Sequence, residues 1–408
     1  MKTLLLISGG IEAVAGIQLA KRMRLHVVVS DANPQAPGFA LADDTLLAST
    51  YDVEATIAAA TRYHREVRPI DGVICIASDV PLTVASVATA LGLPGIPVES
   101  ARLATDKLAM KQRFASYGVP IPWFSAVDSA DHLKALVAAE GLPLVIKPVD
   151  SRGSRGVLRL QPETDLAWAY TTAKGHSPTG RVMLERFLPG PQVSTESLVI
   201  DGVAYTPGFS DRNYEYLERY APHIIENGGQ LSSHLDDATQ QAVRDLVQQA
   251  AQSMGIRNGV VKGDIVVTDG QPHVIELAAR LSGGYFCTHE IPLNTGVDFV
   301  GAAIRQALGE AINPRELHPQ FNRPVAQRYF FPEPGTVQAI QGMEAFIHHP
   351  EVAYLELRVK PGDRIGPVDS HPARAGVVIT TGTTRTAAID LAETVVAEIM
   401  IQIQPLTE

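Results

Sequence analysis

Two acidic residues bracket a turn within otherwise apolar strands at 260–280, and they limit what this part of the chain can fold into. Asp264 and Glu276 stand on either side of the turn pair Asp269-Gly270. If the hairpin has a three-residue loop about Gly270, the two carboxylates face each other with side chains about 5 Å apart. A two-residue turn would place them on opposite faces of the hairpin. The facing arrangement would let both carboxylates bind one or two Mg²⁺ ions, which prefer oxygen ligands and also accept phosphate and water.

The same strand continues to Arg280. Period-two alternation puts Ala278 and Arg280 on the face of Glu276, so the guanidinium would point towards whatever the metal holds. The alternative is structural: Asp264 lies at a strand edge, and Glu276 forms an ion pair with Arg280.

A lysine closes a second apolar strand, and a glycine-rich loop follows it. Lys147 ends the run 144–147, and a buried ammonium is costly unless an anion meets it, with phosphate the obvious choice. Gly153 and Gly156 allow successive backbone N–H groups to converge on such a phosphate. The loop joins two strand patterns, unlike a Walker loop, which opens a helix. A solvated turn is the alternative for this segment.

Residues 182–190 combine a strand with an extended, Pro-terminated end. Its backbone donors and acceptors suit a flat heterocycle, and Phe187 and Leu188 would supply apolar walls. This segment therefore resembles an adenine hinge, and a plain linker is the alternative.

The beginning of the chain alternates short apolar runs with helical patterns. The apolar runs lie at 4–7, 27–30 and 72–76, and the helical patterns at 13–23 and 53–67. This order predicts βαβ units and a parallel sheet. Gly9-Gly10 follows the first run, but the loop lacks the spacing G-x-G-x-x-G, which favours a tight turn over a dinucleotide site.

Later changes of pattern predict three domains. Prolines at 94–97 before a helix from 106 predict a boundary near residue 98, and α and β patterns up to 188 predict a small lid at about 118–188. From about 316 the pattern changes to strands, turn pairs and a last helix at 386–401. The predicted domains are 1–98, 99–315 and 316–408.

Charge and cysteine content exclude several classes of protein. The net charge of -10 leaves no positive field for nucleic acid or an anionic membrane. The two cysteines, Cys75 and Cys287, are too few for a disulfide framework. The opening apolar run is too short for a signal sequence or a membrane span. We therefore expect a cytoplasmic protein without nucleic-acid or membrane partners.

Taken in order, these motifs resemble the ATP-grasp superfamily over about residues 1–315. The resemblance implies an α/β and α+β fold in three parts: a doubly wound parallel sheet, an ATP-grasp core with a small lid, and a smaller C-terminal α+β domain. The segment 276–284 and the C-terminal domain look most like the L-amino acid ligases and related carboxylate-amine ligases. Homodimerisation is a further expectation from the family.

The resemblance also assigns roles by position. Asp264 and Glu276 would bind Mg²⁺, with Mn²⁺ as an alternative, and Arg280 and Lys147 would be the catalytic cations. Ala278 departs from the family, where asparagine often completes the metal shell, and Gln192 stands where an acidic ribose ligand is usual. The residues implied for ATP binding are Lys107, Lys147, Ser151, Gly153, Ser154, Arg155, Gly156, Glu185, Arg186, Phe187, Leu188 and Gln192.

The implied reaction is attack of a carboxylate on the γ-phosphate of ATP, followed by capture of the acyl phosphate by an amine. Three alternatives stay open: a carboxyphosphate-forming enzyme like biotin carboxylase, a simple kinase, and an ATP-binding protein without catalysis. The sequence does not choose the small-molecule acid or amine. Candidate substrate contacts are Glu196, Arg212, Ser282 and His289, and the segment 210–234 is a candidate covering loop.

Overall fold

The computed structural model describes residues 1–405, which divide into two compact units. Unit 1 contains Met1–Ile121, Val193–Phe209 and Leu235–Phe321. Unit 2 contains Pro122–Gln192, Ser210–His234 and the described residues from Asn322 onwards. No helix within residues 1–405 is long and apolar enough to cross a membrane.

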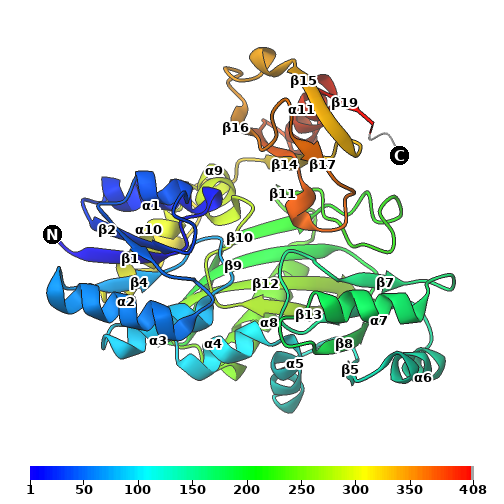
Figure 1. Ribbon diagram of the computed structural model, residues 1–408, viewed down its shortest axis with the longest axis horizontal. Helices are drawn as coiled ribbons and strands as arrows, with labels where there is room; N and C mark the ends of the chain where they lie inside the picture. The colour runs from blue at the N-terminus through cyan, green and yellow to red at the C-terminus, as the bar shows by residue number, and fades with distance from the viewer. Residues whose placement is uncertain (406–408) are drawn as a thin grey trace. The chain divides into compact units, whose positions relative to one another are not determined.

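Unit 1 begins with a parallel four-stranded sheet in the order β3-β2-β1-β4. Every residue of β1 is buried, as expected for a strand covered on both faces. Figure 1 shows α1 and α10 on one face of this sheet and α2 and α3 on the other. The strands are β1 (Thr3–Ile7), β2 (His26–Asp31), β3 (Asp44–Leu47) and β4 (Gly72–Ile74), and the helices are α1 (Val14–Arg22), α2 (Val53–Glu66), α3 (Pro81–Ala90) and α10 (Phe299–Ala307).

The rest of unit 1 is an antiparallel layer with helices against it. Strands β13, β12, β9 and β10 are neighbours in that order. Apolar side chains of α8 pack on β12 and β13, and the Asp236 side chain caps the start of α8. The bounds are α4 (Val98–Thr105), α5 (Lys107–Ser116), β9 (Gln192–Ile200), β10 (Val203–Arg212), α8 (Asp237–Ser253), β12 (Gly259–Thr268), β13 (Gln271–Ala278) and α9 (Ile291–Thr295).

Unit 2 contains a small antiparallel sheet in the order β5-β8-β6-β7, with α6 and α7 packed together and a core of its own. Its strands and helices occupy the predicted lid. The bounds are β5 (Phe124–Val127), α6 (Ala130–Glu140), β6 (Leu144–Pro148), β7 (Leu158–Leu160), α7 (Leu166–Gly175) and β8 (Val182–Arg186).

The C-terminal part of unit 2 has a second core, formed where α11 packs on β14 and β18. Strands β11-β14-β18-β16 are neighbours in that order, and β17-β15-β19 form a separate sheet. The bounds are β11 (Gly229–Leu231), β14 (Val325–Phe330), β15 (Gly335–Gln341), β16 (Val352–Leu357), β17 (Arg364–Ile365), β18 (Gly376–Thr381), α11 (Arg385–Glu398) and β19 (Met400–Gln404).

The structure confirms the predicted mixture of a parallel sheet, antiparallel core strands, a small lid and a C-terminal α+β part. The last helix was predicted too long, because residues after Glu398 form β19 against β15. Its sequence, Met-Ile-Gln-Ile-Gln, alternates with period two and indicates a strand. The domain boundaries near 98 and 315 stay predictions.

Candidate active site

The hairpin of β12 and β13 places Asp264 directly opposite Glu276. The predicted three-residue loop is wrong, since Thr268 pairs with Gln271 around a two-residue turn. The register then shifts between Asp264 and Ile265, which leaves one extra residue on β13. This bulge returns the two carboxylates to facing positions, which a regular hairpin with this turn would not do.

Two lysines accompany these carboxylates. Lys107 Nζ lies 3.3 Å from Glu276 Oε1, and Lys262 Nζ lies 2.5 Å from Asp264 Oδ1. Ser194 Oγ also donates to Asp264 Oδ1 over 3.0 Å. Lys262 was not predicted, although it stands two residues before Asp264, where period-two alternation could have found it. The acidic pair therefore lies among cations that compensate its charge.

The donor atoms of this pair fit Mg²⁺. Two opposed carboxylates offer the oxygen ligands that Mg²⁺ prefers, while buried Ala278 offers none. No group of three or more His, Cys, Asp or Glu side chains suited to a metal occurs within residues 1–405. The pair would thus supply part of a coordination shell, as at magnesium sites completed by phosphate and water.

Arg280 is held by Asp79, which lies in the connection between β4 of the parallel sheet and α3. Its Nε lies 3.3 Å from Asp79 Oδ1, and its Nη1 donates to the Leu281 carbonyl oxygen over 3.2 Å. Burial alone would lower the pKa of Arg280, but nearby Asp79 and other acidic groups outweigh it and raise the pKa. Asp79 is 201 positions away in sequence, so no local pattern could have revealed it.

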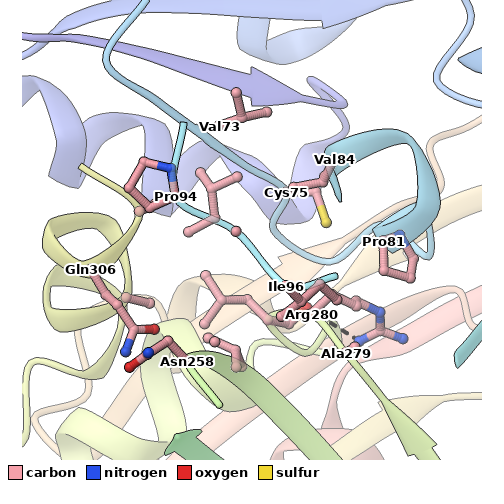
Figure 2. Close-up of a pocket in the computed structure, with 17 residues that line it drawn as sticks. Val73, Cys75, Pro81, Val84, Pro94, Ile96, Asn258, Ala279, Arg280 and Gln306 are labelled. Atoms are coloured by element: carbon pink, nitrogen blue, oxygen red, sulfur yellow. Dashed lines mark hydrogen bonds between the residues drawn. The ribbon is translucent and has the colours of Figure 1, made fainter. Parts of the chain in front are cut away.

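A cavity of about 110 Å³ is lined in part by Arg280. Figure 2 shows its mostly apolar lining, with Cys75, Pro81 and Ile96 near Arg280. Burial raises the pKa of Cys75 to about 12, so its thiol stays protonated and is a poor nucleophile.

Two predicted substrate contacts, Glu196 and Ser282, bind each other. Ser282 N donates to Glu196 Oε1 over 2.8 Å, and the Ser282 hydroxyl donates to Oε2. Glu196 is fully buried, and burial raises its pKa to about 7 against the opposing effect of the Ser282 hydrogen bonds. Glu196 is therefore poised to change charge near neutral pH.

This pKa predicts a pH dependence of stability. Between about pH 4.5 and 7 the folded state holds a proton that the unfolded state has released, so the free energy of unfolding falls as pH rises, by on the order of 3 kcal/mol. Above pH 7 the contribution is constant. Glu196→Gln should flatten this slope, measured by urea unfolding from pH 4.5 to 8, whereas exposed Glu163→Gln should keep it. An unchanged slope in Glu196→Gln would contradict the assignment.

His289 lies in the short helical turn Phe286–Glu290, after Tyr285 in the left-handed conformation. Its Nδ1 is 2.9 Å from Thr288 Oγ1, and its ring meets that of Tyr285 edge to face. Close to this turn in the sequence, Gly284 N donates to Glu12 Oε2 over 2.7 Å. Glu12 was not predicted as a site residue. The substrate role of His289 stays a prediction.

In unit 2, Lys147 and Glu185 form a buried ion pair. Lys147 Nζ lies 2.5 Å from Glu185 Oε1, and both side chains are 4% exposed. The strands β6 and β8 that carry them are paired, with Val145 opposite Glu185. The anion next to Lys147 is thus a carboxylate of the protein, so the cost of burying the lysine does not by itself require phosphate.

The glycine-rich loop has three residues with positive φ: Gly153, Ser154 and Gly156. At Gly156 a Cβ would come within 2.8 Å of the His176 side chain, so glycine is required there. Ser154 Oγ donates to the Ile224 carbonyl oxygen, and His371 N donates to the Gly153 carbonyl oxygen. Two later segments of the chain therefore fix this loop.

The predicted hinge, residues 182–190, consists of β8 and the extended residues that follow it. Arg186 donates to the Glu140 carbonyl oxygen and to the Glu140 carboxylate. Phe187 N donates to the Pro143 carbonyl oxygen, and the guanidinium of Arg159 lies over the Phe187 ring. Leu188 is half-buried, and Gln192 begins β9.

Arg212, the fourth predicted substrate contact, belongs to unit 2 and pairs with Glu226. Glu226 lies in the connection between β10 and β11, which was predicted as a covering loop. Residues of this connection contact β7 and the C-terminal part of unit 2.

Comparison with protein families gives two matches. Residues 104–284 match the ATP-grasp domain, and residues 328–404 match the L-amino acid ligase C-terminal domain 2.

Individual proteins agree with these matches. The uncharacterized protein y4rH of Sinorhizobium fredii is 27% identical, covering 96% of this chain and 81% of its own length. A D-alanine–D-alanine ligase of Desulforudis audaxviator is 30% identical over 200 residues. The match covers 46% of this chain and 62% of the length of that relative. The crystal structure of L-amino acid ligase from Bacillus licheniformis has a TM-score of 0.82, 22% identity and 99% coverage of both chains, which shows a common fold.

Proposed function

Because the chain belongs to the ATP-grasp superfamily and carries an L-amino acid ligase C-terminal domain, we propose that it is an ATP-dependent carboxylate-amine ligase. The reaction joins a small carboxylate to an amine, with ATP converted to ADP and phosphate. The carboxylate oxygen attacks the γ-phosphorus and ADP leaves; the amine nitrogen then attacks the acyl carbon, phosphate leaves and a proton is lost from nitrogen. The product is an amide, and an amino acid as amine would give a peptide bond.

The facing pair of Asp264 and Glu276 carries this proposal. Mg²⁺ bound there would neutralise charge on the ATP phosphates during transfer. The bulge brings the two carboxylates to facing positions, and bulges of this kind are typical of functional positions in sheets. Similarity to the D-alanine–D-alanine and L-amino acid ligases supports amide formation as the use of this chemistry.

The protein's own residues contribute mainly charge and alignment. Arg280, oriented by Asp79, would stabilise negative charge that grows on the transferred phosphoryl group. Lys107 and Lys147 would bind phosphate oxygens in exchange for their present carboxylate partners. The loop Ser151 to Gly156 would cover the phosphates with backbone N–H groups, and residues 185–188 would hold adenine.

Phosphate release from Mg-ATP, with mass spectrometry of the products, tests the proposal over a matrix of L-amino acids and other small carboxylates crossed with amines. The expected result is release that needs both an acid and an amine and yields the mass of an amide. Release that needs only bicarbonate would favour carboxyphosphate formation, and a stable phosphorylated acid without amine would favour a kinase. ATP binding without turnover over the whole matrix would contradict the ligase.

A further inference from the structure

The cavity of about 110 Å³ lies wholly within unit 1, and the proposed reaction does not use it. Its walls come from β4, α3, the connection after α3, the start of β12, the residues after β13, and α10. Folded interiors contain few voids larger than a water molecule. An engineered cavity of about 150 Å³ binds benzene, so this cavity approaches the size that a small ring needs.

The end of the cavity at Cys75 and Arg280 offers little hydrogen bonding. The Cys75 thiol donates to the Ser78 carbonyl oxygen over 3.3 Å. Arg280 directs Nε to Asp79 and Nη1 to the Leu281 carbonyl oxygen. A water molecule inside a protein makes about three hydrogen bonds, which this end does not supply. The apolar part of a ligand would therefore fit here better than water does.

Two side-chain amides, those of Asn258 and Gln306, line the cavity away from that end, as Figure 2 shows. Asn258 Oδ1 accepts from Asp201 N over 3.0 Å, and Gln306 Nε2 donates to the Val199 carbonyl oxygen over 2.8 Å. These bonds fix which atom of each amide is the oxygen, and they leave the Asn258 Nδ2 donor and the Gln306 Oε1 acceptor for a ligand. Since Asn258 is exposed, this end of the cavity opens to solvent.

The cavity is separate from the facing carboxylates of the same hairpin. The described residues that line it include Val260 and Arg280, but neither Asp264 nor Glu276. Val260 and Arg280 each stand four residues from the facing pair along the chain. Four residues of strand span about 13 Å. An occupant of the cavity would therefore contact Arg280 without reaching a metal or a phosphate held by the pair.

From this lining we propose that the cavity is a binding site for a small uncharged molecule with an apolar body and an amide head. The body fills the end at Cys75 and Arg280, while the head accepts from Asn258 Nδ2 and donates to Gln306 Oε1. An anion fits poorly, because it would lose its hydration and find Arg280 already paired with Asp79. The occupant is not one of the reacting substrates, so this site goes beyond the proposed ligase function.

The test follows the unfolding temperature of the full chain with increasing benzamide, toluene or benzoate. Benzamide should raise the unfolding temperature of the wild type, and the concentration dependence gives its Kd. Toluene, which lacks the head, should bind about tenfold more weakly, and benzoate should cause no shift. The benzamide shift should be the same with and without Mg²⁺ and ADP, because the two sites are separate. None of these measurements requires turnover, so the result does not depend on the ligase reaction.

Variants that fill the cavity locate the binding. Ala303→Leu fills it from α10 and should abolish the benzamide shift while keeping the shift with Mg²⁺ and ADP. Val84→Phe fills it from α3 and replaces the first variant if that one does not fold. Exposed Ala90→Leu at the end of α3 is the matched control and should behave as the wild type.

Three results would overturn the proposal. A benzamide shift that persists in the filling variants, or disappears when Mg²⁺ and ADP bind, would place the ligand outside the cavity. Benzoate or toluene binding as tightly as benzamide would show that the cavity does not select an uncharged molecule with an amide head. No shift with any of the three compounds would show that the cavity does not bind ligands of this size.

Discussion

Glu276→Ala should lower Mg-ATP-dependent phosphate release by about 10³-fold or more. The substitution removes one of two opposed carboxylates and the partner of Lys107. The remaining Asp264 is paired with Lys262, so a single carboxylate would have to hold the metal. The assay is phosphate release with the best acid and amine, repeated over a range of Mg²⁺ concentrations.

The matched control is Asp269→Asn in the turn of the same hairpin. Asp269 has φ of 51°, a conformation that asparagine tolerates, so this variant should fold and keep its activity. Full activity in Glu276→Ala, or an equal loss in Asp269→Asn, would show that the hairpin carboxylates do not serve the reaction. Partial recovery of Glu276→Ala at high Mg²⁺ would agree with a weakened metal site.

Arg280→Lys should lower kcat by at least about 10²-fold, with a smaller change in the KM for ATP. Lysine keeps the charge but loses the Nε contact with Asp79 and the planar donor array. An interaction made mainly in the transition state affects kcat more than binding. Steady-state kinetics with both substrates saturating makes the comparison.

Two further variants provide comparisons for the result with Arg280→Lys. Asp79→Asn, which leaves Arg280 in place but weakens its orientation, should cost about tenfold in kcat. Exposed Arg22→Lys in the same unit should have no effect. A near-normal kcat in Arg280→Lys would show that this arginine takes no part in the reaction and serves only as the structural partner of Asp79.

The sequence revealed local features of the site well and its long-range partners poorly. Period-two alternation and a turn pair were enough to predict the hairpin with Asp264 and Glu276. The bulge at Ile275 was not predictable, because the shift in register arises from pairing along the strands and has no local signature. The facing arrangement was therefore predicted from the wrong turn.

Contacts between distant residues account for what was missed. Asp79 meets Arg280, and Arg374 meets Glu226, only after the chain folds back over many residues. The strand β19 was missed for another reason: it was read as the end of a helix, although its alternation was present. The ion pair of Lys147 with Glu185 likewise depends on the pairing of β6 with β8.

The make-up of unit 2 has a consequence for protein engineering. The lid, the connection 210–234 and the C-terminal residues belong to one compact unit, and His371 bonds to Gly153 across 218 positions. A chimera that exchanges only the C-terminal part with a relative would replace one side of these contacts and keep the other. A chimera should therefore exchange all three segments together. A single crossover cannot do this, because segments of unit 1 separate them in the sequence.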